Sequence, residues 1–231
     1  MAEDQIKLDL ERRRRLGFDE AVFCAGKSNA QMTAILDQLA ASEASMLLTR
    51  LDQAAFAELP DIHRDAIDYD PVSKTGFFGR LDKVRGDPKI AVVTAGSSDV
   101  PVALEAIRTL TFNGVSTLPI HDVGVAGLWR LIERIDEIKA LPVVIVVAGM
   151  DGALPSVMGG LVPGLIIAVP TSVGYGASRS GETALHAALA SCAPGLLVCN
   201  IDNGYGAACA ALRGLNMMPA LSSADDHLDR S

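Results

Sequence analysis

The sequence predicts an α/β protein in which a doubly wound parallel sheet follows a smaller α/β region. The first observation is that charged residues are concentrated in the N-terminal part. Residues 1–88 contain 12 Lys and Arg and 16 Asp and Glu, whereas residues 89–231 contain 8 Lys and Arg and 12 Asp and Glu. The second is that five continuous apolar runs alternate with five helical segments after Pro88, as in strands covered by helices on both faces. We therefore expect a polar N-terminal region at residues 1–88, a larger domain at residues 89–221 and a polar tail at residues 222–231.

The N-terminal region has the signals of short helices and strands. Gly17 ends a charged helical segment, and Ser28 is a good N-cap for a helix with Met32, Ile35 and Leu39 on one face. Residues 60–88 are polar and rich in Pro and Gly, so they are expected to be irregular or to form a hairpin. The predicted elements are helix Asp4–Arg15, strand Glu20–Cys24, helix Ala30–Ala41, strand Ser45–Thr49 and a helical turn at Gln53–Glu58.

The larger domain has a regular strand–helix alternation. The predicted strands are Ile90–Thr94, Val115–Ile120, Pro142–Ala148, Leu165–Val169 and Leu196–Asn200. The predicted helices are Asp99–Leu110, Val125–Lys139, Ala153–Leu161, Gly181–Ser191 and Gly204–Leu215. Because parallel strands are joined by right-handed crossovers, their carboxyl ends share one edge of the sheet, where ligands bind.

Composition excludes several classes of protein. The net charge of −8 gives no general attraction to nucleic acid or to anionic membranes. The longest apolar run, Ala140–Ala148, is shorter than the roughly 20 residues of a membrane-spanning helix. The N-terminus lacks the apolar core of a signal peptide, and the cysteines show no CxxC spacing. We therefore expect a cytoplasmic protein with free thiols, and no His/Cys cluster indicates zinc.

Five polar loops are expected at the shared edge of the sheet. Helix caps and turns alone explain any one such loop, but five together predict a polar pocket on an apolar scaffold. The loops are Ala95–Asp99, His121–Gly124, Gly149–Gly152, Pro170–Ala177 and Asn200–Gly204.

Standard phosphate-binding motifs are incomplete in this sequence. A P-loop ending in Gly26–Ser28 would have Ala21 in place of its first glycine, and a GxGxxG motif fails at Arg179 or at Cys209. The run Gly96–Asp99 at a helix N-terminus suits a phosphate. Ser and Asp are also the preferred N-caps, so a purely structural role stays open.

Several longer motifs resemble one known family. The run from Thr94 to Ala106 resembles the first loop and helix of the aminoimidazole ribonucleotide (AIR) carboxylase, or PurE-like, fold. Further runs are similar to its LarB branch, which makes a precursor of the nickel-pincer nucleotide used by lactate racemase. These runs are Asp122–Gly127, Ala148–Ser156, Ala168–Gly176, Ser191–Gly195 and Asn200–Ala207, with Arg15–Phe18, Ala25–Lys27 and Leu48–Arg50 in the N-terminal extension.

The resemblance implies a reaction and its partners. The enzyme would carboxylate C5 of the pyridinium ring of nicotinic acid adenine dinucleotide, with CO2 or bicarbonate as co-substrate. It would also hydrolyse the phosphoanhydride, giving AMP and pyridinium-3,5-biscarboxylate mononucleotide. No tightly bound cofactor is implied, the need for a metal such as Mg²⁺ stays open, and PurE-like relatives suggest a homo-oligomer, typically an octamer.

The resemblance also suggests the groups that do the chemistry. A thiolate that adds to the electron-poor ring would make C5 nucleophilic, and a carboxylate would then remove the C5 proton. By the match to the family, Cys192 is the nucleophile and Asp151 the base. The chain departs from the family in two places, with Trp129 where a His is expected and Asp151 where Glu is common. The alternative, purely structural role of Asp151 is that of a helix N-cap before Ala153.

Other loop residues are candidates for substrate binding. Ser97, Ser98 and Asp99 would hold a ribose phosphate, and Lys27 and Arg50 a pyrophosphate. Asp122 is a candidate for ribose or Mg²⁺. A flexible loop that would close over the ring contains Thr171, Ser172, Gly174 and Gly176. A ribose or a metal would be held by Asn200, Asp202 and Asn203, which as turn residues need no such role. Two alternatives stay open: a purine-pathway AIR carboxylase or mutase that uses His121, and a nucleotide-binding protein without catalysis.

Overall fold

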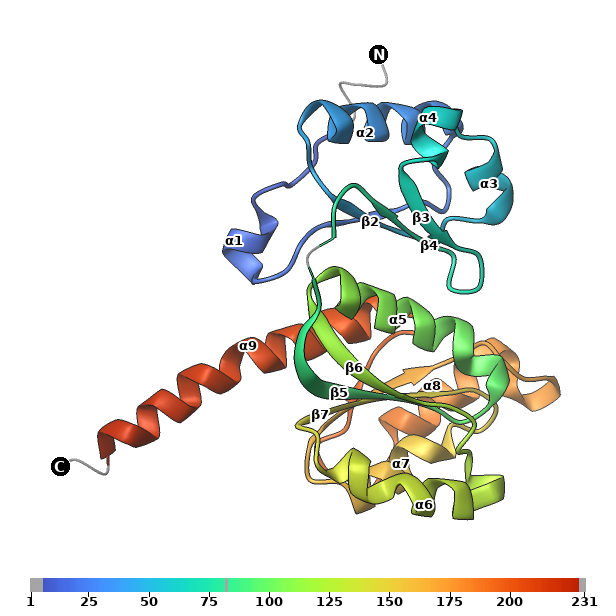
Figure 1. Ribbon diagram of the computed structural model, residues 1–231. Helices are drawn as coiled ribbons and strands as arrows, with labels where there is room; N and C mark the ends of the chain where they lie inside the picture. Colours follow the sequence, from blue (N-terminus) through green and yellow to red (C-terminus); the bar gives the residue numbers. More distant parts are fainter. Residues whose placement is uncertain (1–5, 82, 229–231) are drawn as a thin grey trace.

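The computed structural model describes residues 6–81 and 83–228, with the side chains of 85 and 218–228 left aside. These residues form two sheets stacked one above the other in Figure 1. The upper sheet has four strands in the order β1-β2-β4-β3, and the lower has five in the order β6-β5-β7-β8-β9. All pairs of the lower sheet are parallel. The prediction of a doubly wound α/β fold with a smaller α/β region before it is confirmed.

The N-terminal unit is a small mixed sheet covered by helices. Ser28 and Gln31 form a reciprocal capping box that starts α2, so the predicted cap is confirmed. Residues 60–88 contain the β3–β4 hairpin and a further short helix. The elements are β1 (Ala21–Phe23), α2 (Asn29–Ala41), β2 (Met46–Thr49), α3 (Gln53–Ala57), α4 (Asp61–Arg64), β3 (Ile67–Asp70) and β4 (Thr75–Phe78).

The prediction of a helix over Asp4–Arg15 is wrong for most of the described residues in that range. Helix α1 comprises only Arg12–Leu16, and Ile6 and Leu8 lie before it in irregular chain that packs against the N-terminal core. The two apolar residues are two positions apart, which suits an extended chain better than a helix face. The backbone N–H of Asp9 donates to Glu20 (2.6 Å), which ties this segment to the start of the sheet. Residues 1–5 lie outside the described part.

The five-stranded sheet has buried strands, and the helices divide between its two faces (Figure 1). Helices α5 and α9 cover one face, and α6 and α7 pack against the other. The strands are β5 (Arg85–Thr94), β6 (Val115–Ile120), β7 (Val143–Ala148), β8 (Leu165–Pro170) and β9 (Leu197–Val198). The helices are α5 (Val100–Phe112), α6 (Leu128–Lys139), α7 (Ala153–Leu161), α8 (Glu182–Leu189) and α9 (Gly204–Leu228), with 3-10 turns η2 (Ser97–Asp99), η3 (Val125–Gly127) and η4 (Gly176–Gly181).

Several element boundaries differ from the predicted ones. Strand β5 starts at Arg85 instead of Ile90 and pairs there with Val115 before a register shift. Strand β9 is only two residues long, and in the turn that follows it the Asn200 side chain accepts the N–H of Ile201. Helix α9 continues past Leu215 and projects away from the sheet in Figure 1.

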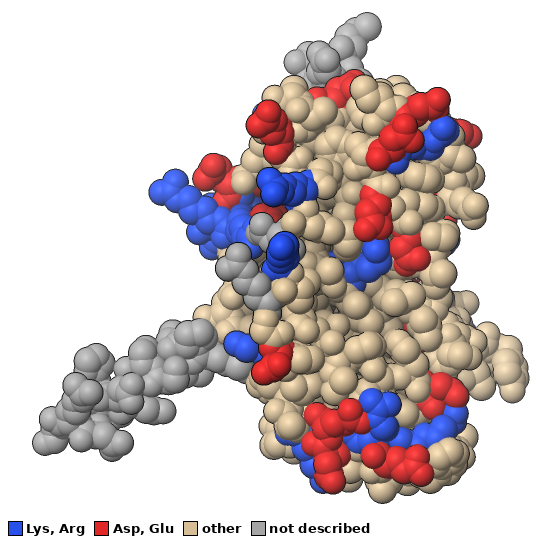
Figure 2. Space-filling view, viewed as in Figure 1, with Lys and Arg blue, Asp and Glu red and all other residues tan. Residues whose placement is uncertain are grey.

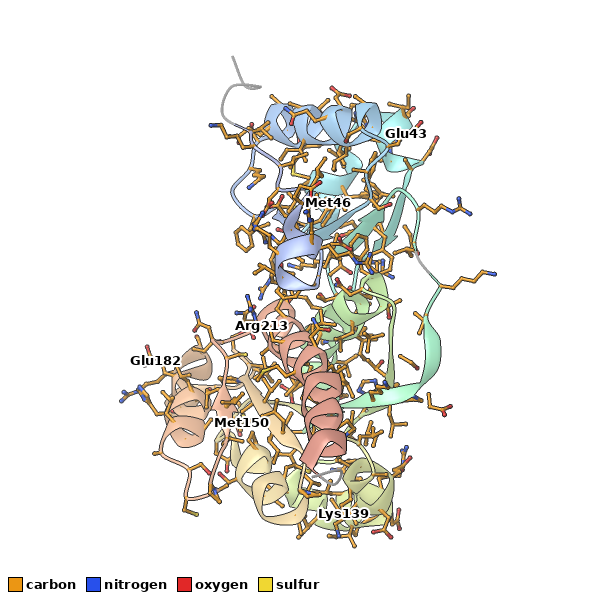
Figure 3. All side chains as sticks on the ribbon, turned by 90° about the vertical axis from the view of Figure 1, so that its left-hand side faces the viewer. Glu43, Met46, Lys139, Met150, Glu182 and Arg213 are labelled. Carbon is orange, nitrogen blue, oxygen red and sulfur yellow. The ribbon has the colours of Figure 1, made fainter. Side chains whose placement is uncertain are left out.

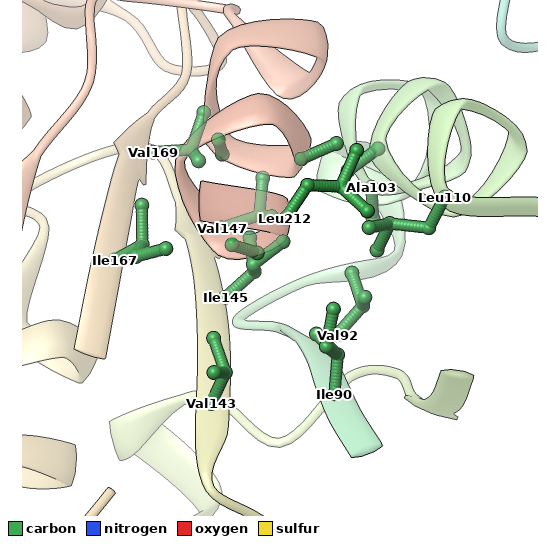
Figure 4. Close-up of a cluster of buried hydrophobic side chains, with 14 of the residues drawn as sticks. Ile90, Val92, Ala103, Leu110, Val143, Ile145, Val147, Ile167, Val169 and Leu212 are labelled. Carbon is green, nitrogen blue, oxygen red and sulfur yellow. The ribbon is translucent and has the colours of Figure 1, made fainter. Parts of the chain in front are cut away.

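The core of the larger unit is aliphatic on both sides of the sheet. Figure 4 shows the side facing α5 and α9, where Ile90, Val92, Ile145 and Val169 interdigitate with the two helices. Phe18 from the N-terminal region belongs to this same cluster and is 4% exposed. Figure 3 shows Arg213 on α9 just below α1, and its guanidinium lies 5.3 Å from the Phe18 ring centroid.

Helix α5 lies between the two sheets and joins the two units. Leu47 and Phe77 of the N-terminal sheet pack against Phe112 at the end of α5. Arg108 of α5 covers the Phe77 ring at 3.9 Å and donates to Thr75 (2.6 Å). Apolar packing and hydrogen bonds therefore both hold the N-terminal unit on the larger one.

Among the described residues, none of the helices combines the length and the apolar character needed to cross a bilayer. In Figure 2, acidic and basic side chains alternate over the upper unit and along the lower rim near α6, with uncharged surface between them.

Candidate functional site

A pocket of about 620 Å³ opens at the carboxyl ends of β5 and β7. Strand β5 has β6 on one side and β7 on the other, so the strand order reverses at β5. Doubly wound folds bind ligands at the carboxyl ends of the strands where this reversal occurs. We call it the edge pocket. Most of its wall is small or apolar, and its polar side chains are Ser98, Asp99, Arg130 and Asp151. This mixture of an apolar wall and a few polar groups is typical of small-molecule sites.

Asp99 is a buried link between two loops of this edge. It is 3% exposed, and its carboxylate accepts hydrogen bonds from the Gly96 N–H (2.9 Å) and from the Thr171 hydroxyl (2.6 Å). Burial raises the pKa of Asp99, although these donors oppose the shift. Ser97 and Ser98 beside it are exposed at the start of α5. The two serines therefore face a ligand more directly than Asp99 does.

The loop after β7 presents Asp151 to solvent. Met150 and Gly152 both have left-handed backbone conformations (φ 55° and 63°), which are uncommon for a residue such as Met. Gly152 is the N-cap position of α7, so the alternative role of Asp151 as a cap is wrong. Among the described residues, the Asp151 side chain has no hydrogen-bond or ion-pair partner. Asp151 lines the edge pocket and also a side pocket of about 320 Å³ next to Tyr175 and Ser178.

A third pocket lies between the two units. This interdomain pocket of about 290 Å³ is bordered by Arg50 and Lys74 of the N-terminal unit and by Glu105 and Asp202 of the larger one. It shares Ser98 and Val173 with the edge pocket. The two pockets therefore lie on either side of the same two residues.

Arg50 bridges the two units. Its Nε donates to the buried carboxylate of Glu105 (3.1 Å), and its Nη2 donates to the backbone carbonyl of Asp202. Glu105 is 4% exposed and also accepts the Tyr205 N–H (3.2 Å). Burial raises the pKa of Glu105, while Arg50 opposes the shift. Arg50, which we predicted from the sequence, thus reaches the edge of the larger sheet.

The loops after β8 and β9 contact each other. Asp202 accepts the Ser172 N–H (2.8 Å) and has a left-handed backbone (φ 57°). Asn203 accepts the Gly206 N–H in the first turn of α9 (2.8 Å). Asp202 therefore joins two loops, whereas Asn203 stabilises the start of a helix. Gly174 has φ 142°, and a side chain there would overlap the Ser178 hydroxyl. Gly176 also has positive φ, so this segment depends on glycine.

Cys192 lies away from these pockets within one chain. It is exposed in the connection that follows the carboxyl end of α8, and the neighbouring Ser191 hydroxyl bonds Ser156 of α7 (2.7 Å). The side pocket, which Asp151 also lines, borders the amino end of α8, a helix of eight residues and about 12 Å. Burial raises the pKa of the other three thiols, Cys24, Cys199 and Cys209, and that of Cys24 reaches about 12.

The remaining candidates are spread along the same edge. Asp122 forms an ion pair with Arg130 at the wall of the edge pocket. Trp129 is 64% exposed on α6 and points away from the core. Lys27 follows β1 and His121 follows β6, and neither borders the three pockets described above. In the described part of the chain, no group of three or more His, Cys, Asp or Glu side chains is placed to bind a metal.

Sequence reasoning missed three charged residues of the site. Arg130 and Glu105 are on helices, and Lys74 is in the β3–β4 turn. None of them stands in one of the five polar loops predicted at the edge of the larger sheet. Of the three, only Arg130 could have been predicted from the sequence. It lies eight residues after Asp122, on the helix α6 that follows β6.

Two models of known protein families match consecutive parts of this chain. Residues 3–80 match the model of a LarB/PurE-like N-terminal domain, and residues 89–225 match the model of AIR carboxylase. An uncharacterized protein of Methanocaldococcus jannaschii is 37% identical over 214 residues, covering 89% of this chain and 82% of the relative. A crystal structure of a Treponema denticola PurE2 variant aligns with a TM-score of 0.44 at 18% identity, over 63% of this chain and 98% of that one.

Proposed function

Because the chain belongs to the AIR carboxylase family and carries a LarB/PurE-like N-terminal domain, we propose that it carboxylates a pyridine dinucleotide. The substrate is nicotinic acid adenine dinucleotide, which is carboxylated at C5 of its pyridinium ring. Hydrolysis of the phosphoanhydride then releases AMP and pyridinium-3,5-biscarboxylate mononucleotide, a precursor of the nickel-pincer nucleotide.

The observation that supports this proposal best is the pair of adjoining pockets. A dinucleotide has two nucleotide halves, and the edge and interdomain pockets meet at Ser98 and Val173. The edge pocket contains Asp151, the proposed base, and Arg130, a cation for the substrate carboxylate or phosphate. A mononucleotide such as AIR would need only one of these pockets.

The chemistry follows from the electron-poor ring. The thiolate of Cys192 adds to the ring, and the enamine that results attacks CO2 through C5, forming the new C–C bond. Asp151 takes the C5 proton, and departure of the thiolate returns its electron pair to sulfur and restores the aromatic ring. Asp151 is suited to this step because it is exposed to the pocket and no described side chain competes for it.

Cys192 would reach the ring from a second copy of the chain. Within one chain, α8 separates Cys192 from the pocket that contains Asp151. A homo-oligomer that places the α8–β9 connection of one copy at the sheet edge of another supplies the missing thiol.

Mass spectrometry tests the reaction directly. The protein is incubated with nicotinic acid adenine dinucleotide and ¹³C-bicarbonate, and the mixture is analysed for the carboxylated mononucleotide and AMP. Parallel reactions contain AIR in place of the dinucleotide. If the dinucleotide gains no carboxyl mass and releases no AMP, the proposal is overturned. Turnover of AIR alone would favour the purine reaction.

Complementation tests the placement of Cys192. Cys192→Ala and Asp151→Asn are each expected to abolish turnover. When the two variants are unfolded together and refolded, mixed oligomers contain some sites with both native groups, so part of the activity returns. If the mixture stays inactive while wild-type protein treated in the same way recovers, Cys192 does not act across copies.

A further inference from the structure

The interdomain pocket contains two cationic side chains of the N-terminal unit, Arg50 and Lys74. The Leu51 N–H donates to the Lys74 carbonyl (2.8 Å), so the β3–β4 turn is fastened to the residue that follows Arg50. Both Arg50 and Lys74 have left-handed backbone conformations (φ 53° each). Non-glycine residues in this conformation cost stability and are concentrated at functional sites.

The acidic side chains of this pocket already have hydrogen-bond partners within the protein. Glu105 accepts hydrogen bonds from Arg50 and from the Tyr205 N–H, and Asp202 accepts the Ser172 N–H. Arg50 uses Nε and Nη2 in its bonds, and no described residue accepts from Nη1. Since a guanidinium has five donors in all, Arg50 is fixed in place and still has donors for a ligand.

Lys74 is held only weakly. Its ammonium pairs with Asp52 at 2.6 Å, and both side chains are more than half exposed. Exposed ion pairs of this kind contribute little to stability, because water screens the two charges. Lys74 can therefore leave Asp52 for a phosphate oxygen at small cost, and the exposed Ser98 lies on the opposite wall.

We propose that the interdomain pocket binds the adenylate half of the dinucleotide, with its phosphate between Arg50 and Lys74. This inference rests on the proposed function, because it assigns the half of that substrate that leaves as AMP. The N-terminal unit thereby selects dinucleotides over mononucleotides. The pyridinium half occupies the edge pocket on the other side of Ser98 and Val173.

Binding of AMP alone tests this site without any turnover. Titration calorimetry compares the wild-type chain with Lys74→Gln, Lys74→Glu and the control Lys139→Gln. Lys139 is exposed at the end of α6, far from the pocket, and is labelled in Figure 3. Loss of a charge-assisted hydrogen bond should weaken AMP binding about tenfold in Lys74→Gln. Charge reversal should weaken it further, and the control should equal the wild type.

A second ligand separates the two halves of the site. Nicotinic acid mononucleotide should bind equally well to all four proteins, because it occupies the edge pocket. Unchanged AMP affinity in Lys74→Glu, or a matching loss for the mononucleotide, overturns the inference. AMP binding that depends on Lys74 in a protein that does not carboxylate the dinucleotide would support this site and refute the proposed function.

Discussion

The hydroxyl of Thr171, at the end of β8, donates a 2.6 Å hydrogen bond to Oδ1 of Asp99, which precedes α5. Both residues are buried. Because β7 lies between β5 and β8 in the sheet, this bond crosses above the end of β7 and closes the floor of the site. It fixes the loop that carries Ser98 relative to the loop that carries Ser172.

Thr171→Val should destabilise the protein. Valine has nearly the same shape but leaves the buried Asp99 oxygen without its hydroxyl donor, which costs about 1–3 kcal/mol. Urea denaturation measures the loss. Thr117→Val is the control, since Thr117 is half-buried on β6 and its hydroxyl has no hydrogen bond in the described residues. Equal effects of the two changes would show that the Thr171–Asp99 bond adds nothing.

Asp9 should make stability depend on pH in the acid range. The hydrogen bond from Arg15, with help from Arg12, lowers the pKa of Asp9 from 3.8 to about 2. Because the folded-state pKa is depressed, this contribution is present above pH 3.8 and is lost as pH falls toward 2. Denaturation midpoints of Asp9→Asn and wild type should differ at pH 6 and converge near pH 2. Asp136→Asn, at an exposed position on α6, should show no such convergence.

The four cysteines should react with iodoacetamide at very different rates. Cys192 is exposed, whereas burial raises the pKa of Cys24 to about 12. At pH 8 only about one Cys24 in ten thousand is then a thiolate, the reactive form. Peptide mapping after brief alkylation should find the label at Cys192 and none at Cys24. Labelling of Cys24 as fast as Cys192 would mean that the β1 end opens readily.

Ser178→Ala should stabilise the protein. The Ser178 hydroxyl is buried with no hydrogen-bond partner in the described residues, and such a group costs about 1–3 kcal/mol. Removing it should raise the free energy of unfolding by about 1 kcal/mol. Ser180→Ala changes an exposed hydroxyl in the same segment and should have little effect. A loss of stability in Ser178→Ala would show that the hydroxyl has a partner in solution.

Phe18→Ala should destabilise the larger unit, although Phe18 belongs to the N-terminal region. Its ring is 4% exposed within the core formed by β5, β7, β8, α5 and α9. Truncation of a buried Phe costs about 3–5 kcal/mol. Hydrogen exchange should show faster exchange in β7 and α9 of the variant. Phe23→Ala, at a residue that is 58% exposed, serves as the control.

Local pattern was enough to predict the five-stranded sheet. Its strands are continuous apolar runs, and all six residues of β7 are buried, so their identity follows from composition over a short window. Ser28 was predictable as a cap for the same reason. The helix over residues 4–15 was wrong because the fate of Ile6 and Leu8 depends on a core built by later residues.

The site was predictable only where it is made of loops. Asp151 and Ser98 follow strands in polar turns and do line a pocket. The buried position of Asp99 depends on Thr171, 72 residues away, and that of Glu105 on Arg50, 55 residues away. Such pairings come from tertiary packing, and the spacing of residues along the chain contains no sign of them.

The position of α5 between two sheets has a consequence for synthesis of the chain. Leu47 and Phe77 are made before Phe112, their packing partner, and before the rest of α5. As the chain emerges from the ribosome, the first sheet therefore exposes an apolar face until α5 follows it. Nascent chains with such exposed faces tend to associate wrongly or to engage chaperones. Truncated products that end before α5 should accordingly be the most prone to aggregate.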